Sequence, residues 1–121
     1  MTNLNTIKKE NLDGSQKQLI SQVDGIIEEI ESGKYEFEAG DYDEPCAADY
    51  LKNVLEINYI IGSDKSYKGA ILLVALGGPN IWINTKEKKV EGYWGGDEYV
   101  KTYFEDTLGI DDEMEEIYNC S

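Results

Sequence analysis

The spacing of apolar residues changes from helical to strand-like near Glu56, and this change constrains the fold most. Apolar residues recur at intervals of three and four between Leu19 and Ile30, so they line one face of a helix. Ser15 is a suitable cap for the start of this helix, and Gly33 for its end. Beyond Glu56 the apolar residues alternate or run continuously between turn residues, which is typical of strands.

The second half of the chain is predicted to form a four-stranded antiparallel meander. Strands are expected at 57–61, 70–76, 81–84 and 90–94, separated by turns rich in Gly, Asn and Lys. A short helix that starts at Asp43 or Glu44, before Pro45, is expected to precede the sheet. After the sheet, 99–108 and 111–118 have helical spacing, with Asp111 as the cap of the last helix. The sequence therefore predicts an α+β fold, with N-terminal helices, the meander, and C-terminal helices packed on one sheet face.

The length and the absence of long apolar runs indicate a small cytoplasmic protein. A chain of 121 residues is expected to form a single domain over 1–121, with a frayed segment at 1–15. No apolar run approaches the roughly 18 to 20 residues of a membrane span, and the N-terminus lacks the apolar core of a signal peptide. In a reducing cytosol, Cys46 and Cys120 are expected to be free thiols rather than a disulfide.

The 25 acidic residues are concentrated in two segments, which we call the acidic arms. The first arm, 24–49, has 10 acidic residues and one Lys, and the second, 97–121, has nine acidic residues and one Lys. Their net charges of −9 and −8 dominate the chain total of −14. A field of one sign repels nucleic acid and steers cationic partners toward the protein. The charge pattern therefore points to a basic partner, and a protein that itself binds DNA or RNA is such a partner.

The chain contains neither His nor Arg, which excludes most common active-site designs. We expect a protein that is not an enzyme and that uses no cofactor and no metal. The carboxylates at 41–44 and 111–113 lack the ordered spacing of a calcium loop, and the segment that starts at Asp64 has Lys68 at its fifth position and Ala75 at its twelfth. Acidic neighbours disfavour a reactive thiolate at Cys46.

The most distinctive stretch is Gly77-Gly78-Pro79-Asn80-Ile81-Trp82, followed by Glu91-Gly92-Tyr93-Trp94-Gly95. This pattern, within 55–120, resembles small acidic proteins encoded on plasmids, conjugative elements and phages of Gram-positive bacteria. The resemblance implies an anti-defence role in the cytoplasm of a bacterial host, of the anti-CRISPR type that inhibits Cas9. Trp82, Tyr93 and Trp94 either cover the core or form a contact patch. If Trp94 packs inward, Tyr93 is the exposed residue, because consecutive strand residues point to opposite faces.

The predicted function is inhibition of a nuclease by an acidic, nucleic-acid-mimicking surface that occupies its DNA- or RNA-binding site. The alternatives are an immunity protein that neutralises a basic toxin, and a domain whose acidity serves only solubility. Direct nucleic-acid binding and membrane binding are not expected, and a homodimer is an open alternative. The expected partner-binding residues are the carboxylates of both arms and one aromatic: Glu36, Glu38, Asp41, Asp43, Glu44, Asp49, Tyr93, Asp97, Glu98, Glu105, Asp106, Asp111, Asp112, Glu113, Glu115 and Glu116.

Overall fold

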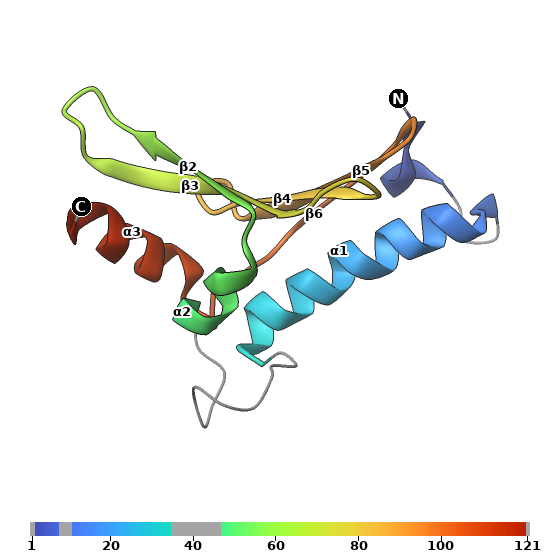
Figure 1. Cartoon of the computed structure of the whole chain (residues 1–121). Coiled ribbons are helices and arrows are strands. Elements are labelled where there is room, and N and C mark those ends of the chain that lie inside the picture. The colour runs from blue at the N-terminus through green and yellow to red at the C-terminus, as the bar shows by residue number, and fades with distance from the viewer. Residues whose placement is uncertain (1, 8–10, 35–46, 121) are drawn as a thin grey trace.

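A six-stranded sheet in the order β1-β6-β5-β4-β3-β2 forms the centre of the protein. The structure is a computed structural model that describes residues 2–7, 11–34 and 47–120 (Figure 1). Five strands form an antiparallel meander, and the two-residue strand β1 pairs with β6 in parallel. The α+β prediction is confirmed, whereas the predicted number of four meander strands is wrong. The strands are β1 (Thr2–Asn3), β2 (Glu56–Ile61), β3 (Tyr67–Ala75), β4 (Asn80–Asn84), β5 (Lys89–Trp94) and β6 (Asp97–Thr102).

The additional meander strand is β6, which occupies part of the segment predicted as a helix at 99–108. Gly95 and Gly96 connect β5 to β6, and Trp94 pairs with Asp97 across this turn. Gly95 has a φ of 62°, which suits the first position of a type II′ hairpin turn. The chain therefore turns back into the sheet, and the helix prediction for this segment is wrong. The rest of it, Tyr103–Leu108, is irregular.

The long helix α1 (Gly14–Ser32) confirms the helical spacing of the N-terminal segment. Its N-cap is Asp13 rather than the predicted Ser15: the Asp13 carboxylate accepts a hydrogen bond from the Gln16 N–H, and the Gln16 side chain accepts one from the Asp13 N–H. This reciprocal pair is a capping box. The helix ends at Gly33, as predicted, with a φ of 73° that favours glycine.

The remaining helical segments are short. After the undescribed residues 35–46, α2 (Ala47–Tyr50) continues into the 3-10 helix η3 (Leu51–Asn53), so the predicted start near Pro45 lies outside the described residues. The last helix, α3 (Ile110–Cys120), is confirmed, but Asp111 lies in its first turn rather than at its cap. The Asp106 carboxylate instead accepts hydrogen bonds from the N–H groups of Gly109, Ile110 and Asp111.

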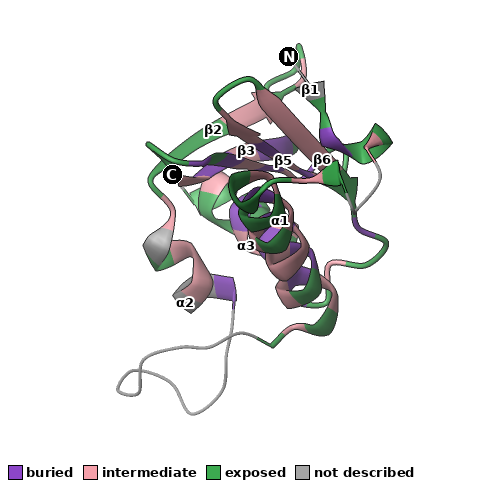
Figure 2. Cartoon of the chain, turned by 90° about the vertical axis from the view of Figure 1, so that its right-hand side faces the viewer, coloured by how far each residue is buried: buried purple, intermediate pink, exposed green. Residues whose placement is uncertain are grey.

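In the part of the chain that the structure describes, the helices lie on one face of the sheet and no second layer covers the opposite face (Figure 1). α1 packs on β5 and β6, whereas α3 packs on β3 and contacts α2. The core lies between helices and sheet, and Figure 2 shows the buried residues concentrated there. The largest fully buried side chains are Leu19, Val23, Ile30, Leu72, Ile81, Ile83, Val90, Ile110 and Met114.

Within the segment 1–15, for which fraying was expected, the structure describes strand β1 and a short 3-10 helix that packs on the core. Leu4, in the 3-10 helix η1 (Leu4–Thr6), is only 2% exposed and joins the core. The side-chain amide of Asn5 extends the β1 pairing, because it accepts a hydrogen bond from the Val100 N–H and donates one to the Val100 carbonyl. None of the helices that the structure describes is long and apolar enough to cross a membrane.

Candidate partner-binding surfaces

Half of the acidic residues of the first arm lie outside the described residues. Five of its expected site residues, Glu36, Glu38, Asp41, Asp43 and Glu44, fall between 35 and 46 together with Cys46, and Asp49 belongs to α2. The second arm is described almost completely. The acidic surface that the structure describes best is therefore that of residues 97–120. Cys120, in the same segment, is an exposed free thiol.

Three carboxylates of the second arm accept hydrogen bonds within the fold. Asp97 accepts one from the Gln16 side-chain amide at 3.2 Å, which ties β6 to the start of α1. Asp111 accepts a hydrogen bond from the Tyr67 hydroxyl at 2.7 Å, which ties α3 to β3. Asp106 accepts the three N–H groups at the start of α3. These three expected site residues therefore hold elements together, and we assign them a structural role.

The outer side of α3 carries carboxylates with no such role. Asp112, Glu115 and Glu116 are exposed, and their spacing of three and four residues places them on one side of the helix, away from the buried Ile110 and Met114. We call Asp112, Glu115 and Glu116 the α3 acidic face. Glu113, in the first turn, is half-buried, and Glu105 is exposed in the loop before the helix.

The α3 acidic face forms no ion pair with the described residues. The ion pairs between described residues join Lys89 to Glu87 and Glu91, and Lys101 to Asp24, and none of these residues belongs to α3. An acidic residue in the first helical turn is stabilised by the helix dipole, which accounts for Asp112. Glu115 and Glu116 lie beyond that turn. Their charges therefore need a different explanation.

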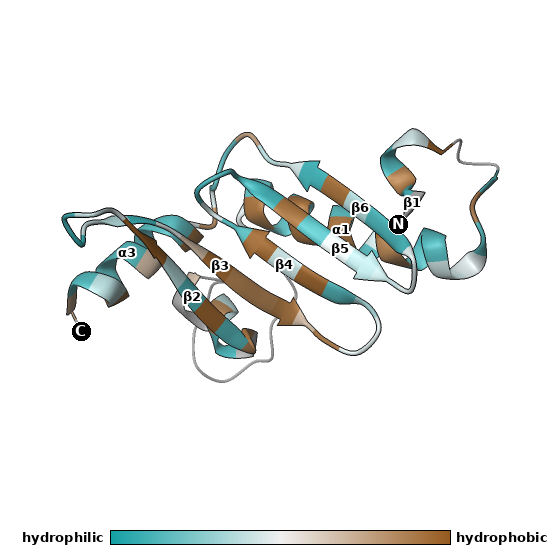
Figure 3. Cartoon of the chain, turned by 90° about the horizontal axis from the view of Figure 1, so that it is seen from above, coloured by the Kyte–Doolittle hydropathy of each residue, from teal (hydrophilic) through white to brown (hydrophobic). Residues whose placement is uncertain are grey.

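The second candidate surface is the sheet face that no helix covers. It appears in front of the helices in Figure 3, with hydrophobic and hydrophilic residues mixed along the strands. Gly92 faces α1, because a Cβ atom at Gly92 would meet Leu19 and Val23. Since successive strand residues point to opposite faces, the neighbours of Gly92 in β5 and the residues paired with them lie on the face away from α1. We call the set the uncovered sheet face: Ile71, Leu73, Trp82, Asn84, Lys89, Glu91, Tyr93, Glu98 and Val100.

Two aromatic residues stand at the centre of the uncovered sheet face. Trp82 pairs with Glu91 across β4 and β5, and Tyr93 pairs with Glu98 across β5 and β6. The Tyr93 hydroxyl donates a hydrogen bond to Glu91 at 3.3 Å, and burial, followed by the charge of Glu91, raises the pKa of Tyr93. Trp94 packs against the core on the other face. Tyr93 and Trp94 therefore point to opposite faces, as predicted, but Tyr93 is half-buried rather than exposed.

The two surfaces do not meet. α3 lies beneath the sheet on the same side as α1, whereas Tyr93 and Glu98 lie on the uncovered sheet face (Figure 1). The expected site residues of the second arm are therefore divided between two opposite sides of the protein. Trp82, which was named as a possible contact residue, and Glu91, which was not among the expected residues, lie beside Tyr93 on this face. Strand alternation could have placed these residues on the same face as Tyr93, but only once the register between β4 and β5 was known.

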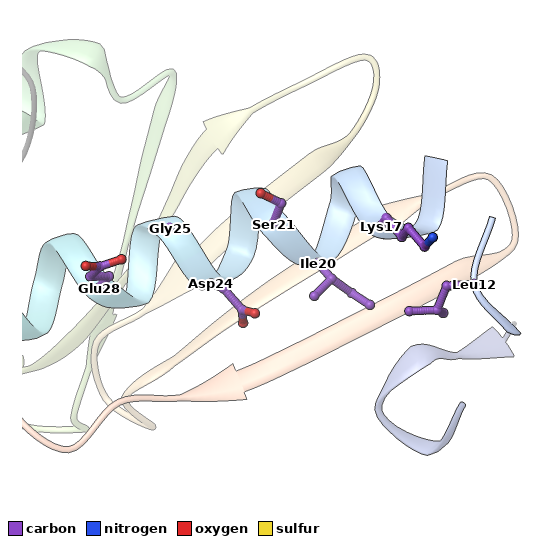
Figure 4. A pocket seen from close by; sticks show the side chains of 7 residues that line it. All are labelled: Leu12, Lys17, Ile20, Ser21, Asp24, Gly25 and Glu28. Atoms are coloured by element: carbon purple, nitrogen blue, oxygen red, sulfur yellow. The ribbon is translucent and has the colours of Figure 1, made fainter. Parts of the chain in front are cut away.

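An open groove of about 890 Å³ follows α1 (Figure 4). Its polar lining includes Lys17, Ser21, Asp24 and Glu28, and its apolar lining includes Leu12 and Ile20. Asp24 is engaged within the fold, because its carboxylate accepts a hydrogen bond from the Tyr99 hydroxyl at 2.9 Å and contacts the Lys101 ammonium at 3.2 Å. Burial, together with this hydrogen bond, raises the pKa of Tyr99 to about 12. These contacts make Asp24 a link between α1 and β6.

Within the described ranges, no three metal-ligating side chains lie together in a group that could hold an ion. Comparisons of the chain with protein-family models, with curated proteins and with solved structures find no match.

Proposed function

We propose that this protein is a non-enzymatic anti-defence inhibitor that binds a basic nucleic-acid-binding surface of a bacterial nuclease, with Cas9 as the preferred target. It acts in the cytoplasm of the host cell. The α3 acidic face enters the DNA- or RNA-binding groove of the nuclease and pairs with Lys and Arg side chains there. The choice of Cas9 rests on the resemblance of the segments around Trp82 and Tyr93 to mobile-element proteins.

The uncompensated charge of the α3 acidic face is the observation that carries this proposal. Its three carboxylates are exposed, share one side of a helix and form no ion pair within the described residues. A helix rises about 1.5 Å per residue, so Asp112 and Glu116 lie about 6 Å apart along the axis. One DNA strand places about two phosphates in that length. The spacing of the carboxylates is therefore compatible with Lys and Arg side chains arranged to bind phosphates.

The geometry changes the expected anchor of the contact. Charges mainly increase the rate of association, whereas well-packed apolar or aromatic residues provide most of the binding energy. Tyr93 lies on the opposite side of the protein from the α3 acidic face. Ile117 follows Glu116 directly and is 41% exposed. We propose Ile117 as the apolar contact beside the carboxylates.

Cleavage of target DNA by guide-loaded Cas9 tests the proposal when the order of addition is varied. The protein is added before the guide, after the guide, or after the DNA has bound. Inhibition that disappears once DNA is bound supports competition for the DNA site, and inhibition only before guide loading supports the RNA site. Cleavage that is unaffected in all three orders contradicts Cas9 as the target, and a basic toxin then becomes the next partner to test.

A further inference from the structure

The edge strand β2 is the surface of the protein whose pairing is least complete. Among the described strands, β2 ends the sheet and pairs with β3 alone, through the register Glu56–Leu73 to Ile60–Gly69. An antiparallel strand directs the N–H and C=O groups of alternate residues away from its partner. On the free side of β2 these groups face outward, where they can pair with another strand.

The side chains at this edge favour association. Leu55, Ile57 and Ile61 are 60%, 39% and 48% exposed. β2 contains neither Lys nor Pro, which commonly protect edge strands, and its irregular pairing is confined to its end at Ile60 and Ile61.

An aromatic cluster fixes the position of β2. The Tyr59 ring lies 5.2 Å from the ring of Tyr118 on α3 and 6.4 Å from that of Tyr67 on β3, measured between centroids. These ring contacts connect β2 to α3 and β3 on the side of the sheet that the helices cover. The exposed backbone groups are therefore held in place before any partner arrives.

The charge around β2 differs from that of the rest of the protein. Residues 50–70 contain three Lys (Lys52, Lys65 and Lys68) and two acidic residues (Glu56 and Asp64), a net charge of +1. The whole chain carries −14. Two copies of so acidic a protein repel each other at most approaches. Residues 50–70 therefore add little repulsion of their own between two copies that meet at β2.

The opposite edge of the sheet is less open. β1 pairs with Asp97 and Glu98 of β6, and the Asn5 amide occupies both backbone groups of Val100. Association at β2 is therefore not expected to propagate through the other edge.

From these observations we infer that β2 is a homodimerisation edge, at which a second copy pairs its own β2 in antiparallel orientation. A twofold axis perpendicular to the sheet relates the copies, so both helical layers lie on the same side of a continuous sheet. A twofold interface of this kind is closed and stops at two copies. The inference is independent of the proposed nuclease target.

Sedimentation velocity over a range of protein concentrations tests this inference. We expect a monomer–dimer equilibrium in the unmodified protein. The double substitution Ile57→Lys with Ile61→Lys places like charges at the twofold edge, and we expect it to raise the dimer dissociation constant at least about tenfold, equivalent to about 1.4 kcal/mol. Phe104→Lys is the matched control, because Phe104 is 90% exposed but lies in the loop after β6. It should leave the dimer unchanged.

Amide hydrogen exchange of the unmodified protein gives a second readout that does not depend on the variants. Dimerisation should slow the exchange of alternate β2 amides as the protein concentration rises, while the amides of β6 do not change. A protein that remains monomeric at millimolar concentration overturns the inference. So does a dimer that the double substitution leaves intact, or an assembly whose mass grows beyond two copies.

Discussion

α1 packs closely on the sheet at Gly92. A Cβ atom at this position would lie 2.7 Å from both Leu19 Cδ1 and Val23 Cγ2, closer than side-chain atoms can pack. Gly25, in the interior of α1, has no atom within 4 Å of the equivalent Cβ position. The same substitution at these two glycines therefore has opposite expected effects.

We expect Gly92→Ala to lower the free energy of unfolding by about 1–3 kcal/mol, because it overpacks the contact between α1 and β5. Gly25→Ala should raise it by about 0.5–1 kcal/mol, because alanine loses less conformational entropy in a helix. Urea denaturation of both variants measures the two effects. A Gly92→Ala protein as stable as the unmodified one would contradict the described position of α1.

Glu29 is an acidic residue whose environment opposes its charge. Burial, which outweighs a 3.3 Å hydrogen bond from the Tyr50 hydroxyl, raises the pKa of Glu29 above its usual 4.5. A carboxyl group whose pKa is raised by folding stabilises the folded state below its unfolded pKa, and this contribution is lost as the pH rises through the folded pKa. At neutral pH the ionised Glu29 therefore costs stability.

We expect Glu29→Gln to raise the melting temperature at pH 7, because the amide removes the buried charge at similar size. The advantage should shrink as the pH falls through the raised folded pKa of Glu29 toward 4.5, and it should be lost below 4.5, where the native carboxyl is neutral in both states. Thermal unfolding across this pH range measures the difference. An advantage that does not vary with pH would indicate that packing, rather than ionisation, is responsible.

At the scale of elements, adjacent acidic residues of one arm have different roles. Asp106 accepts three N–H groups at the start of α3, whereas Glu105 is exposed in the loop before it. The sequence shows both as members of the second acidic arm. What distinguishes them is which carboxylate the backbone directs toward the first N–H groups of α3, and this depends on the path of the chain between the end of β6 and α3.

We expect Asp106→Ala to lower the free energy of unfolding by about 2 kcal/mol, the upper end of the usual range for a lost helix cap. Glu105→Ala is the matched control and should change it by less than about 0.5 kcal/mol. Chemical denaturation compares the two variants. Equal losses would mean that the Asp106 contacts do not stabilise α3.

The elements predicted correctly from the sequence are those with strong local signals. The apolar face from Leu19 to Ile30 and the Gly33 stop gave α1, and alternation between turns gave β2 to β5 close to their observed bounds. β6 was missed because Tyr99, Val100, Tyr103 and Phe104 recur with helical spacing. Pairing with β5 across the Gly95-Gly96 turn decided its structure, since tertiary contacts override local propensity.

β1 could not be predicted, because two residues carry no periodicity. The sequence also could not show that Asp106 caps α3 or that the Asn5 side chain continues the pairing of β1, because both contacts depend on the path of the chain in three dimensions. Of the candidate site, the exposure of the α3 acidic face followed from helical spacing. The separation of Tyr93 from that face did not, because it depends on which side of the sheet α3 packs.

At the scale of the whole molecule, the net charge of −14 is distributed unevenly over the described surface. Asp24 of α1 and Asp97 of β6 are engaged in contacts within the fold, residues 50–70 are nearly neutral, and the α3 acidic face forms no ion pair with the described residues. Self-repulsion of this kind is tolerated when it serves solubility or steering. If the acidic residues serve solubility, only their total number matters. If they steer a basic partner, the position of particular carboxylates determines binding.

The most direct test is the affinity for guide-loaded Cas9 of two variants with equal charge change, measured at low and at high salt. Glu115→Lys with Glu116→Lys reverses two charges of the α3 acidic face, and Glu28→Lys with Glu87→Lys reverses two exposed charges, one on α1 and one in the turn between β4 and β5. We predict that the first pair weakens binding at least about a hundredfold at low salt, about 2.7 kcal/mol, and abolishes most of its salt dependence. The second pair should weaken it less than about tenfold, about 1.4 kcal/mol. Equal losses from both pairs, or no binding of the unmodified protein, would contradict the account.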